Sequence, residues 1–215
     1  MHTIIYRNMV YSDFTITKFE QAFGIRQTRA DLFPAPVQTI TPTQHLLMDL
    51  EEAKSLPNFS GKAKSEYIIS PILRELIRQN KGLFTIFSGY SLDVNPLKGL
   101  NGQCDFLLST ATQSLDIKAP IFSIVEAKNR GVEEGIGQCA AELYAAQQVN
   151  EAANMPTPVL YGVVTNAFDW LFIRLDEHTL AVDTQRYYIG QLPELLGIMQ
   201  TIVDLHRPDK LTTIS

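Results

Sequence analysis

Two side chains of opposite charge, Glu126 and Lys128, end the largely apolar run Ile121-Phe-Ser-Ile-Val-Glu-Ala-Lys128. The β-branched residues of this run favour a strand, whose side chains alternate between faces, so Glu126 and Lys128 point to one side. We expect Phe122 and Ile124 on that same side, in the core. A charged residue at a strand end is usually solvated, but two on the core-facing side need charged partners or a metal ion.

Two further acids are expected to converge on this pair. Asp105 lies inside the apolar run Gln103–Ser109, where a lone charge is unfavourable, and it meets Glu126 if the two strands pair as a hairpin. Glu66 extends the apolar helical stripe that begins at Ile69 by one step of three, which places it on the face that packs on the sheet. Three carboxylates and a lysine directed at one place predict a site of hard oxygen ligands.

Oxygen ligands of this kind suit Mg²⁺ or Mn²⁺. A lysine beside such an ion can orient a water molecule or help to deprotonate it, while the cation stabilises charge that develops on a phosphoryl oxygen. This combination fits phosphodiester hydrolysis better than carbonyl chemistry. The basic side chains that could contact a phosphate backbone, or could equally form a solvated face, are Arg74, Arg78, Lys81 and Arg130.

The elements that must position these residues begin with an N-terminal extension. We expect a strand at Val10–Thr17 and a short helix at Lys18–Phe23. A longer helix follows, with Thr41 as its cap, Pro42 at its first position and Gln44 completing a capping box. The extension is expected to pack on the core.

A polar, turn-rich stretch divides this extension, residues 1–57, from a domain of residues 58–215. The domain begins with a helix at Ala63–Asn80, in which Pro71 predicts a kink or a restart capped by Ser70. The other elements are expected at Leu83–Phe87, Gln103–Ser109 and Pro120–Ala127 (strands), Glu133–Ala152 (helix), Val159–Thr165, Trp170–Leu175 and Leu180–Thr184 (strands) and Leu192–His206 (helix). This order predicts an α/β fold with a mixed central sheet flanked by helices, in which three strands form a meander and the later helix crosses over.

Motif and element order together resemble a known family, the PD-(D/E)XK nuclease superfamily. The residues that carry the resemblance are Gly102-x-x-Asp105, Glu126-x-Lys128 and, on the next helix, Gln138. It covers about Lys62–Leu175, and the strand pair within Tyr161–Leu175 resembles the closing strands of type I restriction-subunit nuclease domains. The resemblance implies a restriction-endonuclease-like αβββαβ core and metal-dependent hydrolysis of DNA.

The resemblance also implies a set of metal ligands. Asp105 and Glu126 would bind Mg²⁺ or Mn²⁺, and the backbone carbonyl of Ala127 would contribute a third oxygen. Glu66 would be the helix acid bound to the metal ion or to its water. The implied partner is DNA, with RNA as the alternative substrate, and a homodimer is left open.

Two further residues have implied roles, and two depart from the family pattern. Lys128 would position the attacking water, and Gln138 would steady the site. Cys104 stands where many members have proline, and Glu142 stands four residues after Gln138, where one branch of the superfamily has tyrosine.

A competing pattern, Gly135-Ile-Gly-Gln-Cys-Ala140, matches the phosphate-binding G-x-G-x-x-A signature of dinucleotide-binding folds. In that signature the first glycine directly follows a strand, whereas here six residues intervene. Two of them, Glu133 and Glu134, would repel a phosphate, and the acid expected about 20 residues later is missing. We interpret the glycines as a mobile loop and a helix start.

Composition narrows the class of protein. The 215 residues are 45% hydrophobic and 19% charged with a net charge of −5, typical of one globular domain and not of a general polyanion binder. No apolar run has the length of a signal peptide or a membrane span, so we expect a cytoplasmic protein with no membrane partner. In that compartment Cys104 and Cys139 are expected to be reduced thiols. The acidic balance supports a second hypothesis, a catalytically idle nuclease fold that acts as a binding or assembly module.

Overall fold

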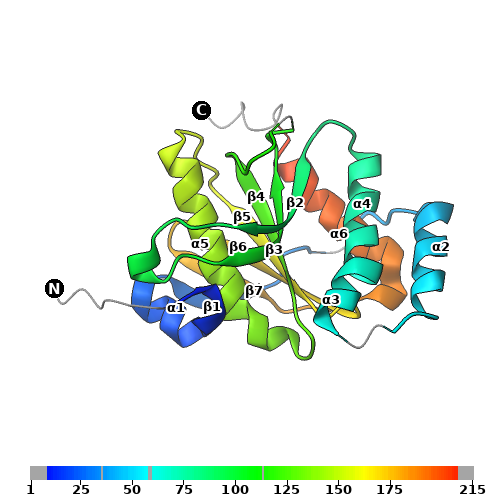
Figure 1. The fold of residues 1–215 in the computed structure, drawn as a ribbon, viewed down its shortest axis with the longest axis horizontal. Coiled ribbons are helices and arrows are strands. Elements are labelled where there is room, and N and C mark those ends of the chain that lie inside the picture. Colours follow the sequence, from blue (N-terminus) through cyan, green and yellow to red (C-terminus); the bar gives the residue numbers. More distant parts are fainter. Residues whose placement is uncertain (1–8, 35, 58–59, 113, 208–215) are drawn as a thin grey trace.

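The computed structural model describes residues 9–34, 36–57, 60–112 and 114–207. It is a mixed α/β fold in which helices pack on both faces of one sheet (Figure 1). The strands are β1 (Arg26–Ala30), β2 (Thr85–Ser91), β3 (Gln103–Ser109), β4 (Ile121–Ala127), β5 (Leu160–Thr165), β6 (Asp169–Leu175), β7 (Thr179–Asp183) and β8 (Tyr187–Tyr188). They form an eight-stranded sheet in the order β1-β7-β6-β5-β4-β3-β2, with β8 paired to β6. The predicted α/β class with a mixed, helix-flanked sheet is confirmed.

The helices are α1 (Ile16–Phe23), α2 (Gln44–Ala53), α3 (Gly61–Lys64), α4 (Ser70–Gln79), α5 (Ile136–Ala152) and α6 (Leu192–Leu205), and a π-helical turn, Ser65–Ile69, joins α3 to α4. Short 3-10 turns lie at Tyr11–Asp13, Pro96–Lys98, Val132–Gly135 and Ile189–Gln191. β2, β3 and β4 pair antiparallel in sequence, and α5 then connects β4 to its parallel neighbour β5. This is the predicted meander followed by a helical crossover. α5 packs on one face of the sheet, and α4 and α6 pack on the other (Figure 1).

The N-terminal segment differs from its predicted elements. No strand forms at Val10–Thr17, because Tyr11 and Phe14 are both buried and lie three residues apart, a spacing that a helical turn and not a strand brings to one side. The helix that follows starts earlier than predicted, after Thr15, whose hydroxyl oxygen accepts a hydrogen bond from Lys18 N (3.3 Å).

The strand of this segment is β1, which the sequence pattern conceals. Its residues, Arg26-Gln-Thr-Arg-Ala30, show no alternation of apolar and polar side chains, and they pair in parallel with β7. A charged strand at the edge of a sheet needs few buried side chains, since backbone hydrogen bonds to one neighbour hold it. The segment before residue 57 thus contributes a strand to the same sheet as the rest of the chain.

α2 begins after Thr43 and not after Thr41, so the predicted capping box with Pro42 and Gln44 is wrong. The Thr43 hydroxyl accepts a hydrogen bond from Leu46 N (3.3 Å) and donates one to Glu75 Oε2 (2.8 Å). Glu75 is a fully buried acid on α4. Because a buried carboxylate needs donors, tertiary packing selects the cap here over the local pattern.

α4 restarts at Ser70 with Pro71 in its first turn, but Ile69 and not Ser70 is its cap. The π-helical turn precedes it, and Ser70 N donates a hydrogen bond to Ser65 O, five residues back. The wider turn accommodates a proline, which has no backbone N–H to donate. The π-helical turn also rotates the side chains before it relative to those after it. The side chain of Glu66 is therefore 52% exposed and does not pack on the sheet as predicted.

Phe122 lies on the opposite face from the predicted one. The pairing of β3 with β4 shifts by one residue, and this bulge leaves Phe122 without a partner and turns it toward α6, where it stacks on His206 (ring centroids 5.0 Å apart). Ile124 packs on the α5 side. The strand alternation that was predicted therefore holds only from Ile124 to Lys128.

Candidate functional site

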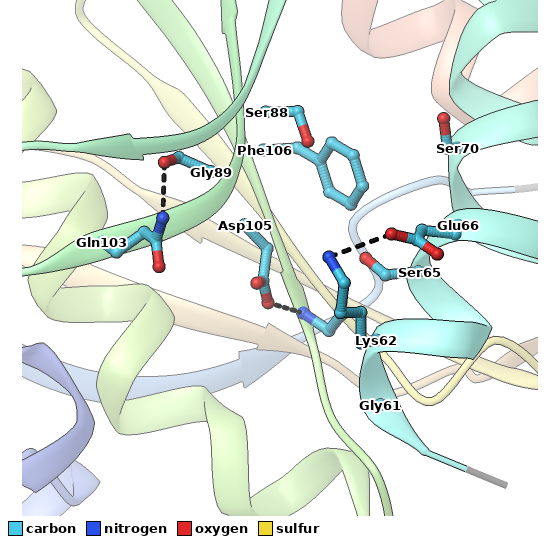
Figure 2. Close-up of a pocket in the computed structure, with 11 residues that line it drawn as sticks. Gly61, Lys62, Ser65, Glu66, Ser70, Ser88, Gly89, Gln103, Asp105 and Phe106 are labelled. Atoms are coloured by element: carbon cyan, nitrogen blue, oxygen red, sulfur yellow. Dashed lines mark hydrogen bonds and ion pairs between the residues drawn. The ribbon is translucent and has the colours of Figure 1, made fainter.

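Three of the predicted site residues, Glu66, Asp105 and Ala127, line an open pocket between the β2–β3 edge of the sheet and the helical segment 61–70 (Figure 2). Its volume is about 500 Å³. The lining residues are Gly61, Lys62, Ser65, Glu66, Ser70, Ser88, Gly89, Gln103, Asp105, Phe106 and Ala127. Most of these side chains are polar, so the pocket suits a polar or charged ligand better than an apolar one.

Asp105 lies on the sheet side of this pocket, and the neighbouring strand fixes its position. Its Oδ2 accepts a hydrogen bond from the backbone N of Ala127 (2.8 Å), drawn as a dashed line in Figure 2. The last paired residues of β3 and β4 are Phe106 and Val125, so the next step along both strands sets Asp105 opposite Glu126. The structure thus brings these two acids together.

Glu126 and Lys128 form a largely buried ion pair next to Asp105. Glu126 Oε1 lies 2.9 Å from Lys128 Nζ, and the exposed fractions of the two side chains are 4% and 21%. Lys128 Nζ also donates a hydrogen bond to Gln138 Oε1 on α5 (2.6 Å). Strand alternation and the following helix therefore place Asp105, Glu126, Lys128 and Gln138 in one network.

Glu142, one turn further along α5, completes this network. Gln138 Nε2 donates a hydrogen bond to Glu142 Oε1 (2.9 Å), which orients the amide so that its oxygen faces Lys128. The Oε2 atoms of Glu126 and Glu142 are buried and have no donor among the described residues. The two carboxyl groups are close enough to share a hydrogen bond, which requires a proton on one of them.

Burial raises the pKa values of all three acids, and the charge of a neighbouring acid adds to the shift for Glu126 and Glu142. The pKa of Glu126 rises from 4.5 to about 7, first because burial disfavours its charged form and then because Asp105 is near, while Lys128 opposes the shift. Burial, followed by the charge of Glu126, raises the pKa of Glu142 well above 4.5. Burial also raises the pKa of Asp105, against the Ala127 N–H that stabilises its carboxylate. A cluster of acids with such shifts is typical of a functional site.

Replacing Glu142 by glutamine is expected to stabilise the metal-free protein, and more so at high pH. A folded-state pKa above the unfolded value stabilises the fold below about pH 4.5, and this contribution is lost as the pH rises through the folded pKa. Glutamine stays neutral, accepts from Gln138 and donates to Glu126 Oε2, for a gain of about 1–2 kcal/mol at pH 8. Urea unfolding in EDTA at pH 5 and pH 8 measures the difference in unfolding free energy between the variant and wild type.

The matched control for this substitution is Glu151→Gln on the same helix, where the side chain is exposed. It is expected to leave the unfolding free energy unchanged at both pH values. A Glu142→Gln protein whose advantage over wild type does not grow between pH 5 and pH 8 would show that the Glu142 carboxyl is not held protonated by its surroundings.

Glu66 lines the same pocket from the helical side (Figure 2). Lys62 Nζ donates a hydrogen bond to its Oε1 (2.9 Å), and this interaction raises the pKa of Lys62. Within the described ranges, no hydrogen bond or ion pair joins Glu66 to Asp105 or Glu126. Glu66 therefore faces the buried network across the pocket and is not part of it.

The other residues singled out in the sequence lie elsewhere. Arg74 and Arg78 are each 3.9 Å from Asp49 of α2 and do not line the pocket. Cys104 and Cys139 are buried free thiols on the α5 side of the sheet. Lys81 and Arg130 do not line the pocket either, although Arg130 follows Lys128 by two residues.

The oxygen donors of the site fit one kind of metal ion. Asp105, Glu126 and the carbonyl of Ala127 are hard ligands, and Mg²⁺ is commonly held by one or two carboxylates together with water. Among the described residues, only a protonated Glu142 can donate to Glu126 Oε2, and a bound cation can take the place of that proton. In the part of the chain that the structure describes, no three His, Cys, Asp or Glu side chains are arranged to hold a metal ion. The donors thus fit binding by the two carboxylates Asp105 and Glu126, with Glu66 facing them across the pocket.

No model of a known protein family matches the chain, and no curated protein sequence matches it. Among the helices that the structure describes, none is long and apolar enough to cross a membrane. Fold and site define a mixed α/β protein that holds a lysine and a cluster of buried acids beside an open polar pocket.

Proposed function

We propose that the chain is a metal-dependent nuclease that hydrolyses phosphodiester bonds of DNA. The observation that carries the proposal is the buried Glu126–Lys128 pair beside Asp105, at the edge of an open polar pocket. The order of elements supports it, because α4, the meander β2–β4, α5 and β5 follow one another as in the αβββαβ core that the sequence resembles.

Each residue of the network has a task in this reaction. Asp105, Glu126 and the carbonyl of Ala127 would hold the metal ion, which when bound stabilises negative charge on a phosphoryl oxygen. Lys128 uses two of its three N–H donors on Glu126 and Gln138, so the third is available for the attacking water. A charged ammonium only donates hydrogen bonds, so Lys128 orients the water through its oxygen and does not remove its proton.

The proposal is tested by metal binding and DNA cleavage on the full chain. Supercoiled plasmid and linear duplex are incubated with Mg²⁺ or Mn²⁺, and we expect cutting that EDTA abolishes. Calorimetry is expected to show Mn²⁺ binding that Asp105→Asn weakens at least about 10-fold, since the amide keeps the shape of the side chain and loses its charge.

The control is Asp116→Asn, which neutralises an exposed acid away from the pocket and should leave Mn²⁺ affinity and cleavage unchanged. If the wild-type chain binds no Mn²⁺ and cuts no DNA, the nuclease proposal fails. That result would favour the alternative, in which the fold acts as a binding or assembly module.

A further inference from the structure

A second, apolar pocket adjoins the polar one across the helical segment 61–69. Its volume is about 430 Å³. Its apolar walls include Leu47, Leu50, Ile68, Phe168, Ile189 and Leu192. Ser65 and Glu66 line the polar pocket, whereas Ile68 lines the apolar one, so the two pockets lie against the same short stretch of helix.

Phe168 is held in this wall by a fixed turn between β5 and β6. Asn166 Oδ1 accepts hydrogen bonds from Phe168 N (3.0 Å) and Asp169 N (2.8 Å), and Phe168 O accepts one from Ile189 N (3.0 Å). Ala167 adopts φ = 80°, a left-handed conformation that is unfavourable for a non-glycine residue. These hydrogen bonds hold the turn in place, yet Phe168 stays 44% exposed.

One cation, Lys64, lies close to this aromatic ring, and a second, Arg130, belongs to the segment whose backbone is tied to the Phe168 turn. Lys64 Nζ lies 5.7 Å from the centroid of Phe168 and donates a hydrogen bond to Asn129 O (2.8 Å). Asn166 Nδ2 donates one to Arg130 O (2.9 Å), which ties the residues after Lys128 to the Phe168 turn. Neither Lys64 nor Arg130 forms an ion pair with a carboxylate in the described ranges, so both charges are available to an anionic ligand.

We propose that this apolar pocket receives an unpaired base of single-stranded DNA, stacked on Phe168, while Lys64 and Arg130 contact the adjacent phosphates. An exposed aromatic ring beside unpaired cations is the combination that single-strand binding uses, because every base offers a face for stacking and the backbone carries a charge at each step. A base inside a duplex is already stacked and paired, so entering the pocket would require it to leave the helix. The inference rests on the proposed function and names its substrate, a strand that passes from this pocket to Asp105.

The test is a binding measurement in EDTA, which needs no cleavage. Fluorescein-labelled single-stranded DNA and the blunt duplex of the same sequence are titrated with the full chain, and fluorescence anisotropy is recorded. We expect wild type to prefer the single strand. Phe168→Ala should weaken single-strand binding roughly 5- to 100-fold, the effect of losing one stacked base, and should change duplex binding little. Lys64→Gln should weaken binding and reduce its salt dependence.

The control variant is Leu97→Ala, which truncates an exposed apolar side chain (69% exposed) outside both pockets and should bind as wild type does. Equal binding of single strand and duplex by wild type, or unchanged single-strand binding by Phe168→Ala, overturns the inference and assigns the apolar pocket to some other ligand. The nuclease proposal can fail on its own. A chain that binds single strands through Phe168 but cuts no DNA contradicts the nuclease proposal and supports the base-binding pocket. A nuclease whose single-strand binding is unaffected by Phe168→Ala contradicts the base-binding pocket and supports the nuclease proposal.

Discussion

Replacing Lys128 by methionine is expected to lower the initial rate of DNA cleavage by at least about 100-fold. Methionine keeps the apolar stem of lysine and removes the ammonium that contacts Glu126 Oε1 and Gln138 Oε1. The water that Lys128 would hold loses its donor, and the buried carboxylate of Glu126 loses its only cationic partner among the described residues. Plasmid nicking at saturating Mn²⁺ measures the rate.

Two further variants separate this effect from a general loss of charge or of folding. Lys118→Met removes an exposed lysine outside the pocket and should cut at the wild-type rate. Lys128→Arg keeps the positive charge, but the planar guanidinium cannot reproduce the compact ammonium, so we expect a folded protein with most of its activity lost. Circular dichroism checks the fold of each variant. A folded Lys128→Met protein that cuts at the wild-type rate would remove Lys128 from the mechanism.

The part of the site that strand geometry dictates could be predicted from the sequence. Side chains two apart on a strand share a face, so Glu126 and Lys128 had to meet, and hairpin pairing with β3 brought Asp105 opposite Glu126. Gln138 came from the family resemblance, and its hydrogen bond to Lys128 places it in the same network. The contacts among the three strand residues depend on local periodicity and on one strand pairing, which are the features that a sequence expresses most directly.

Glu142 and Glu66 show where this reasoning ends. Glu142 lies four residues after Gln138, a spacing that puts the two side chains on one face of α5, and this signal was available. The burial of Glu142 could not be predicted, because it depends on Glu126 and Lys128 filling the other side of the network. Glu66 was misplaced because the π-helical turn shifts the helical phase, and nothing in the apolar stripe signals that turn. β1 escaped prediction because backbone pairing, and not side-chain pattern, holds an edge strand.

Gly137, within the stretch that matches a dinucleotide signature, has a packing role in the structure. A Cβ at this position would lie 2.4 Å from the backbone carbon of Thr15 and 2.5 Å from the carbonyl oxygen of Phe14. The 3-10 turn and α1 of the N-terminal segment therefore pack directly against the first turn of α5, with backbone against backbone. The absence of a side chain permits this approach, which explains the glycine without a phosphate ligand.

Gly137→Ala is accordingly expected to lower the free energy of unfolding by about 2–3 kcal/mol, since the clash is with backbone atoms that cannot rotate away. Tm should fall by roughly 4–12 °C in a chain of this size. The control is Gly131→Ala in the preceding loop, where φ is −73° and a Cβ would meet its nearest neighbour, a flexible Glu133 oxygen, at 3.4 Å. Its Tm should match wild type. If the two variants melt at the same temperature, the backbone of the N-terminal segment does not lie against Gly137 of α5.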